Sequence, residues 1–194
     1  VKQHLVPLSW VREIRSPPER VYNTGGSVPQ SVGPTGSDLA GYLRHNPHVL
    51  SEMNEWLARL EVGYSIEVET VGRPALGVVA LRLHDTSRAT SVDVAFSDVG
   101  YGISQLLPLV AQGIGQREGL VAIQQPEVHV HPRLQAGMGD FFVETSATKQ
   151  FVIETHSEQL VLRLFRRVRE KAIDPAALVI LYVARGSNGS TVRR

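Results

Sequence analysis

An apolar run that stops abruptly in polar residues is the feature of this sequence that most restricts its fold. The run Val121-Ala122-Ile123 is followed by Gln124-Gln125-Pro126-Glu127 and then by Val128-His129-Val130-His131-Pro132. The pattern returns at Phe151-Val152-Ile153, which is followed by Glu154-Thr155-His156-Ser157. Two buried strands that each present polar side chains at their carboxyl end are how an open α/β sheet builds a nucleotide or metal site. The sequence therefore predicts an α/β fold with a site at this edge of the sheet.

Strand and helix patterns alternate through the carboxyl-terminal half of the chain. An apolar helix expected over 103–114 leads into alternating strands and helices at 120–124, 133–145, 150–154, 157–171 and 177–183. This alternation is typical of right-handed parallel crossovers, so we predict a parallel sheet.

The amino-terminal half has a different pattern. Residues 1–36 contain several prolines and glycines and little periodicity, which predicts a loop-rich segment. Ser37 or Asp38 is suited to cap a short helix that Pro47 interrupts, and an apolar stripe then predicts a helix over 48–60. Antiparallel strands are expected around Ile66 and Val68, from Leu76 to Leu83 and from Ser91 to Phe96.

Composition limits the class of protein. The 194 residues suffice for one ordinary domain or a large piece of one, and a hydrophobic fraction of 42% is ample for its core. With 20 basic and 19 acidic side chains, no global field attracts nucleic acid or membrane. The absence of cysteine excludes disulfides and thiolate metal sites and suits the cytosol. No apolar run approaches the roughly 20 residues that span a bilayer, so we expect a cytoplasmic protein with no membrane partner.

The two polar strand ends resemble motifs of one ATPase family. Residues 121–132 resemble the Walker B segment of ABC-type ATPases, and residues 151–157 resemble their switch-histidine segment. The closest likeness is to the SMC/RecF-like branch, whose Walker B line often ends in Glu-Gln-Pro-Glu and continues as His-x-His-Pro. Further matching blocks follow the expected order, namely the signature-like loop Phe96–Gln105, the helix Arg133–Glu144, and the strand, turn and helix of Lys149–Arg169. More weakly, Pro7-Leu8 and Pro18-Glu19-Arg20-Val21-Tyr22 resemble a family of predicted ATPases within that branch.

A P-loop of the form Gly-x-x-x-x-Gly-Lys-Ser/Thr, which cradles phosphates, does not occur in the sequence. The glycine-rich segment 33–37 has no lysine. Since such ATPases carry the P-loop before the signature loop, the resemblance implies the carboxyl-terminal part of a larger P-loop NTPase. Residues 93–194 would form the ABC ATPase-like lobe, and residues 1–92 a smaller middle or insert portion with loops, a helix and antiparallel strands.

The resemblance assigns roles at the end of the Walker B strand. By position, Gln124 matches the acid that holds Mg²⁺ through water, and Gln125 matches the catalytic glutamate. An amide can orient water through its carbonyl oxygen but cannot accept a proton at neutral pH. Gln at the second position is common in the family, whereas Gln124 at the first position departs from it and puts hydrolysis in doubt, whether it is natural or a replacement that traps nucleotide. Glu127 is a substitute Mg²⁺ ligand or a turn carboxylate. The alternative is that both glutamines are ordinary polar residues at a strand end.

The resemblance also assigns contacts to the γ-phosphate. His156 matches the switch histidine, although a histidine there could instead cap the helix that starts at Ser157. In the signature-like loop, a serine hydroxyl and amides at the helix start grip the phosphate bound by the opposite subunit. Ser97 is the first candidate for this contact and Ser104 the second, and Gly100 and Gly102 leave room for the phosphate.

Two other interpretations of these segments stay open. Alternation of Glu127, His129 and His131 on an extended segment would place all three side chains on one face, as in a metal-dependent hydrolase, and His156 could add a ligand. His131 could equally cap a helix that begins at Pro132. The helix over 157–171 carries several arginines that either contact DNA phosphates or form a solvated face partly paired with glutamates.

The family resemblance implies an overall activity. It implies binding of ATP and Mg²⁺ in a head-to-tail homodimer, with hydrolysis coupled to DNA maintenance or to defence against phage, alone or with a nuclease or other effector partner. A nucleotide-gated interaction module that has lost hydrolysis is the main alternative, and the metal-dependent hydrolase is the third.

Overall fold

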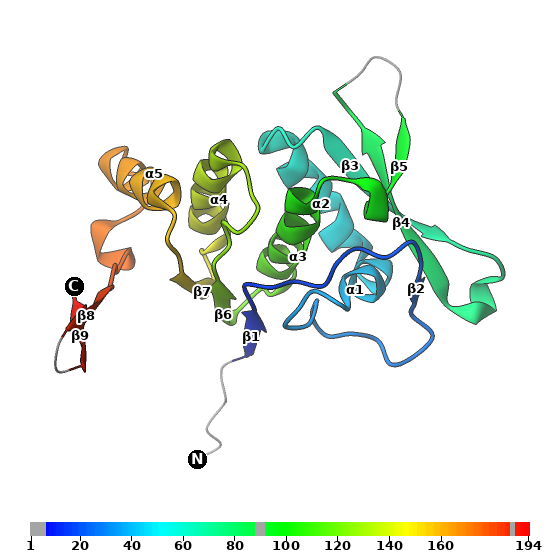
Figure 1. Cartoon of the computed structure of the whole chain (residues 1–194), viewed down its shortest axis with the longest axis horizontal. Helices are drawn as coiled ribbons and strands as arrows, with labels where there is room; N and C mark the ends of the chain where they lie inside the picture. The colour runs from blue at the N-terminus through cyan, green and yellow to red at the C-terminus, as the bar shows by residue number, and fades with distance from the viewer. Residues whose placement is uncertain (1–6, 88–91, 187–188) are drawn as a thin grey trace.

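The computed structural model describes residues 7–87, 92–186 and 189–194. Its parallel sheet has the strand order β1-β6-β7, with β1 spanning Leu8–Val11, β6 Gly119–Gln124 and β7 Lys149–Glu154 (Figure 1). The central strand β6 is held from both sides, and its Val121 and Ile123 are buried. Within the described ranges no strand pairs with the outer edge of β7. The predicted parallel α/β sheet is confirmed.

The helices before β6, between β6 and β7, and after β7 also follow the prediction. They are α3 (Tyr101–Gly115), α4 (Pro132–Thr145) and α5 (Glu158–Arg169). Helix α3 is almost entirely buried, in keeping with its largely apolar sequence, and α4 packs beside α5. Phe141 on α4 meets Trp56 edge to face at 5.0 Å between ring centroids, which ties this layer to the amino-terminal half.

After β1, the amino-terminal half forms an antiparallel portion on the other side of the molecule (Figure 1). Helices α1 (Leu39–His45) and α2 (Pro47–Arg59) are separated by Asn46, so Pro47 does interrupt the helix. Strands β2 (Tyr22–Asn23), β3 (Tyr64–Thr70), β4 (Val78–Asp85) and β5 (Asp93–Ala95) form one antiparallel sheet in which β4 pairs with the other three. Ser91, predicted to begin the last strand, lies outside the described residues. Short 3-10 helices occur at Pro74–Leu76, Phe96–Asp98 and Pro175–Ala177.

The segment expected to be loop-rich is mostly loop and turn in its described part, but it also contains two short strands that were not predicted, β1 and β2. Strand β1 is ordered by pairing with β6 and not by a local pattern. One prediction about an element was wrong. The strand predicted over 177–183 does not join the parallel sheet. Instead β8 (Tyr182–Gly186) forms an antiparallel hairpin with β9 (Gly189–Arg193), and Tyr182 and Val183 are exposed. An apolar run predicts that a strand forms, but it does not predict which neighbouring strand or sheet edge that strand pairs with.

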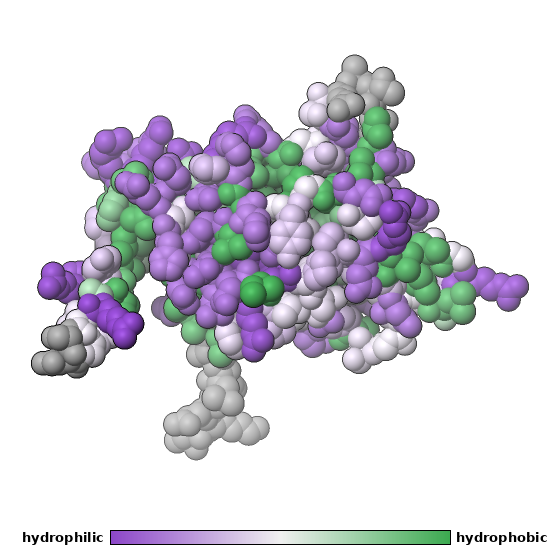
Figure 2. All heavy atoms as spheres, in the orientation of Figure 1, coloured by the Kyte–Doolittle hydropathy of each residue, from purple (hydrophilic) through white to green (hydrophobic). Residues whose placement is uncertain are grey.

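Apolar side chains remain uncovered near this hairpin and α5. The exposed large ones there are Leu162, Phe165, Val179, Leu181, Tyr182, Val183 and Val192, and Figure 2 shows apolar surface beside these elements. In contrast, buried residues from both halves of the chain belong to one hydrophobic cluster. The division at 92/93 stays a prediction. Among the described residues, no helix is long and apolar enough to cross a membrane.

Candidate functional site

The carboxyl ends of β6 and β7 bring the two predicted polar segments together. Gln124 is the register partner of Glu154 in the parallel pair, so their side chains leave the same face of the sheet. Gln124 Nε2 donates a hydrogen bond to Glu154 Oε2 at 3.3 Å. The end of the Walker B-like strand is therefore next to the turn that carries His156.

The chain turns sharply after β6 instead of continuing extended. Gln125 and His129 have φ angles of 42° and 61°, and the amides of Val128 and Val130 donate to the carbonyl groups of Gln125 and Glu127. The premise of the metal-hydrolase interpretation, an extended Glu-x-His-x-His segment, is wrong. Left-handed backbone at non-glycine residues costs of order 1–3 kcal/mol each and is common at functional turns.

Glu127 connects this turn to the segment after β7. Its Oε2 accepts a hydrogen bond from Thr155 Oγ1 at 2.7 Å, and its Oε1 accepts one from the amide of His156 at 2.5 Å. Both carboxylate oxygens are thus engaged in holding the switch-like turn in place. Of the two interpretations of Glu127, this geometry favours the turn carboxylate.

The histidines have separate surroundings. His131 caps α4 through Nδ1, which accepts from the amide of Arg133 at 3.2 Å, as the alternative interpretation expected. Ser157, and not His156, caps α5 by accepting from the amide of Leu160. The exposed imidazole of His156 is therefore not used as a cap. Its assignment as the switch histidine stays a prediction.

Arg15, which sequence reasoning missed, is fully buried beneath the strand end. Its Nη2 donates to the carbonyl oxygens of Gln124 and Gln125, at 3.0 and 3.1 Å. Burial lowers the pKa of Arg15 to about 10, against the attraction of Glu127, so the guanidinium is still charged at neutral pH. Its Nε and Nη1 have no hydrogen-bond partner in the described part of the chain. No sequence signal identifies this residue, because it lies in the segment between β1 and β2.

The signature-like loop reaches the site through the start of α3. Gly100 is the N-cap of α3 and faces open space, whereas a Cβ at Gly102 would collide with the carbonyl oxygen of His129. The rings of Tyr101 and His129 meet edge to face, with centroids 4.9 Å apart. Gly102 is therefore required for close packing, and a phosphate contact there stays a prediction.

The two candidate serines of this loop differ in access. Ser97 is partly exposed, and its hydroxyl donates to Asp98 Oδ1 at 2.9 Å. Ser104 is buried, and its hydroxyl donates to the carbonyl oxygen of Tyr101 at 2.7 Å. Ser97 is thus the more accessible candidate for an external phosphate. The next residue, Gln105, accepts a hydrogen bond from the backbone amide of Arg15 at 3.3 Å and so joins α3 to the strand end.

Carboxylates near the strand ends can serve a magnesium ion only in part. Among the described residues, no group of three histidines, cysteines or acids is placed to hold a metal by itself. A nucleotide-bound Mg²⁺ needs less, since it typically takes one or two carboxylates and completes its shell with phosphates and waters. Glu154, whose side chain has Gln124 as its only hydrogen-bond partner among the described residues, fits that requirement.

Most of the basic side chains of α5 are neutralised by neighbours. Arg163 and Arg167 both bind Asp140, and Arg166 and Arg167 bind Glu170. Although burial opposes ionisation, the bonds from Arg163 and Arg167 hold the pKa of Asp140 below its ordinary value. These pairs favour the interpretation of a solvated helix face over a DNA-binding one.

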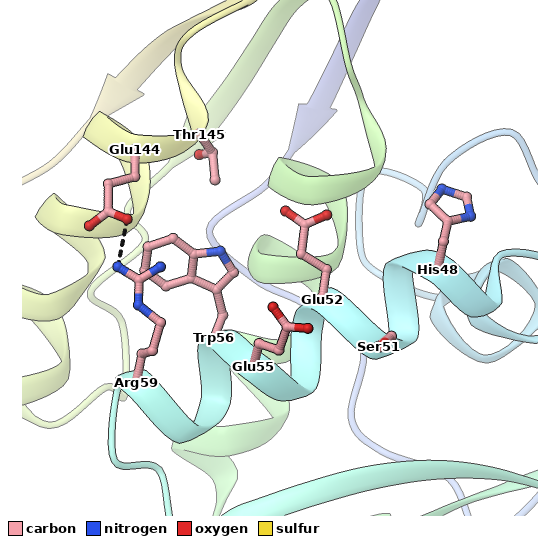
Figure 3. A pocket seen from close by; sticks show the side chains of 8 residues that line it. All are labelled: His48, Ser51, Glu52, Glu55, Trp56, Arg59, Glu144 and Thr145. Atoms are coloured by element: carbon pink, nitrogen blue, oxygen red, sulfur yellow. Dashed lines mark hydrogen bonds and ion pairs between the residues drawn. The ribbon is translucent and has the colours of Figure 1, made fainter.

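A surface hollow lies elsewhere on the molecule. It measures about 560 Å³ and is formed by α2 and the end of α4, where Arg59 stacks on Trp56 and pairs with Glu144 (Figure 3). Because α4 begins beside the carboxyl end of β6 and ends just before β7, this hollow is at the opposite end of the parallel strands. Its position separates it from Gln124 and His156.

Solved structures of SMC heads are similar to this fold. An SMC ATPase studied for ATP-driven dimerization and DNA-stimulated activation aligns over 78% of this chain and 86% of its own, with a TM-score of 0.60 and 16% identity. The Pyrococcus furiosus Smc head with an extended coiled coil, bound to the C-terminal domain of ScpA, aligns over 79% of this chain and 36% of its own (TM-score 0.58, 16% identity). The Thermotoga maritima SMC head aligns over 80% and 49% (TM-score 0.52, 14% identity). The chain thus spans less than half of the last two structures. At these identities the likeness establishes the fold alone.

Sequence comparison identifies the family more directly. Curated proteins give no significant match. A family model described as "AAA domain, putative AbiEii toxin, Type IV TA system" matches residues 19–163, which include the signature-like loop, both polar strand ends and the start of α5. The chain belongs to this family of ATPase domains and has the fold of an SMC head.

Proposed function

We propose that residues 1–194 are the part of an ABC-type ATPase that carries the signature loop, the Walker B strand and the switch histidine. In this proposal the complete protein binds MgATP between the two subunits of a head-to-tail homodimer, and hydrolysis reopens the dimer. The observation that carries the proposal is the convergence of Gln124, Glu127, Glu154 and His156 at the carboxyl ends of two parallel strands. The start of α3 packs against the same turn.

The open edge of β7 supports a P-loop outside residues 1–194. Its backbone has no strand partner on that side among the described residues, and Val152 in its centre is 58% exposed. A parallel strand added there would end beside Glu154 and His156. A P-loop follows the carboxyl end of its strand, so its phosphate-binding amides would face the side chains at the end of β6.

The biological setting belongs to the same proposal. The family description names a toxin of a toxin–antitoxin system, and one similar structure is that of a DNA-stimulated SMC ATPase. These names support the proposal that the activity serves DNA maintenance or anti-phage defence in the cytoplasm, with a nuclease or other effector as the partner.

Nucleotide titration tests the missing-lobe proposal. Residues 1–194 alone should bind MgATP weakly and hydrolyse none, whereas the full-length protein should bind it tightly. Calorimetric titration of MgATP into both proteins gives the comparison. Tight binding by residues 1–194 alone, or no binding by the full-length protein, contradicts the proposal.

A nucleotide-gated module without hydrolysis is the second candidate, because amides occupy both key positions at the end of β6. Gln124→Glu in the full-length protein should then raise turnover. The loss of one preorganised electrostatic contact typically costs about 10²–10³ in rate, so its restoration should give a gain of that order. The rate gain is measured from the burst phase and the steady-state rate of phosphate release in both proteins. An unchanged rate in a folded, dimeric variant shows that Gln124 is not the limiting residue.

A further inference from the structure

We infer that Glu154 supplies the carboxylate that the magnesium ion of this site requires, from the strand beside the one where the family carries it. The inference rests on the proposed nucleotide site. It replaces Glu127 as the metal ligand. It also means that the Gln124 amide lies beside the carboxylate that binds the metal, to which it donates a hydrogen bond.

The register of the sheet places the two side chains together. Gln124 and Glu154 are paired residues at the last positions of β6 and β7, on one face of the sheet. Gln124 Nε2 points at Glu154 Oε2, at 3.3 Å. Neither Gln124 Oε1 nor Glu154 Oε1 has a hydrogen-bond partner in the described ranges, so two free oxygens lie at the site where a cation needs them.

Glu127 is less suited to this task. Its oxygens accept from Thr155 Oγ1 and from the amide of His156, and a metal at Glu127 would compete with both bonds. Those bonds hold the turn that carries His156. Both carboxylate oxygens of Glu127 are therefore already engaged in hydrogen bonds that fix the position of that turn.

The Glu154 carboxylate has no ion pair among the described residues that a cation would have to displace. Arg15, the buried cation below the strand end, donates to the carbonyl groups of Gln124 and Gln125 and makes no hydrogen bond to Glu154. Since no described basic side chain pairs with the Glu154 carboxylate, Mg²⁺ can approach without displacing an ion pair.

Manganese binding tests the inference without depending on turnover. Mn²⁺ replaces Mg²⁺ and is titrated into the full-length protein at saturating ATP, with free Mn²⁺ measured by electron paramagnetic resonance. Loss of a supporting group at a metal site typically lowers affinity about 10–100-fold. We expect Glu154→Gln to lower Mn²⁺ affinity at least about tenfold. Glu158→Gln, which removes an exposed glutamate from the first turn of α5, is the matched control and should leave it unchanged.

A swapped variant distinguishes ligation from general loss of charge. Gln124→Glu combined with Glu154→Gln moves the carboxylate from β7 to β6 and should restore the Mn²⁺ affinity lost in Glu154→Gln. Glu127→Gln should retain Mn²⁺ binding while lowering the melting temperature. If Glu127→Gln abolishes Mn²⁺ binding, or if Glu154→Gln leaves it intact, the inference is overturned.

Nucleotide binding separates this inference from the proposed function. ATP binding by the wild-type full-length protein is measured first in EDTA and then with Mg²⁺. If ATP fails to bind in both conditions, the proposed function itself fails. If ATP binds and Mg²⁺ strengthens it equally in the wild type and in Glu154→Gln, the function stands and the assignment of Glu154 is wrong.

Discussion

Two glycines two positions apart in one loop have different physical reasons to be glycine. Gly100 faces open space at the start of α3, whereas a side chain at Gly102 would meet the carbonyl oxygen of His129. Helix propensity alone predicts that Gly102→Ala stabilises α3 by about 1 kcal/mol. We expect the opposite sign, because overpacking typically costs about 1–3 kcal/mol. Urea unfolding of both variants measures the difference.

Gly100→Ala is the control for that experiment. Its added methyl group has no neighbour within 4 Å, so stability should change by no more than about 0.5 kcal/mol. If Gly102→Ala were as stable as Gly100→Ala, the contact between the start of α3 and the turn after β6 would have to be looser than described.

Arg15 gives a second prediction at the scale of single residues. Arg15→Lys keeps a positive charge but loses the planar fork that reaches the carbonyl groups of Gln124 and Gln125. Hydrogen bonds to charged groups contribute about 1.5–3 kcal/mol, so a loss of about 2 kcal/mol is expected. At about 2–4 °C per kcal/mol for a chain of this size, calorimetry should show a clearly lower melting temperature. Arg169→Lys, an exposed site on α5, should melt as the wild type does.

At the scale of elements, the antiparallel sheet contains a histidine clamp. His84 on β4 lies between Asp93 on β5 and Glu67 on β3, with Nδ1 2.6 Å from Asp93 and Nε2 3.1 Å from Glu67. The hydrogen bond to Asp93 is the main cause that raises the pKa of His84, burial opposes it, and the bond to Glu67 adds to it. The clamp therefore stabilises the sheet most when His84 is protonated.

The sign of the pH dependence follows from that raised pKa. Because the folded pKa of His84 exceeds its unfolded value near 6.5, the added stability is complete below about pH 6.5 and is lost as the pH rises through the folded pKa. Urea unfolding across this range should show the decline, and His84→Gln should remove that part of it. A variant with the same pH slope as the wild type would assign the slope to other groups.

At the scale of the whole molecule, the signature-like loop is expected to act on the partner's nucleotide. Gly100 is exposed, and a Cβ added there would have no neighbour within 4 Å among the described residues. An aspartate at this position should therefore leave the fold intact and repel the γ-phosphate of the nucleotide bound by the partner subunit. Gly100→Asp should abolish ATP-dependent activity while nucleotide binding is retained. Unfolding temperature and ATP titration check that the lost activity does not come from a damaged subunit.

Mixing variants then reports on the dimer. A dimer formed from Gly100→Asp and a P-loop variant retains one intact composite site, so partial ATPase activity should return on mixing. If mixed dimers form and activity does not return, either both sites must act together or the loop works within its own subunit.

Local sequence determined most of the secondary structure and the position of the candidate site along the chain. The apolar run 121–123 and its polar end predicted β6 and the turn after it, and Pro132 and Ser157 marked the starts of α4 and α5, because strand burial and helix capping are local effects. The family match adds that these segments belong to an ATPase domain.

Tertiary structure decided what these segments touch. β1 is ordered by its pairing with β6, and β8 pairs with β9 because long-range partners, and not local pattern, select the edge on which a strand forms. The same holds for Arg15 beneath Gln124 and for Glu154 beside it, since each contact joins residues that are distant in sequence. Sequence pattern records how each segment is buried, but only the folded chain determines which polar groups share an edge of the sheet and thus which of them can meet a metal ion.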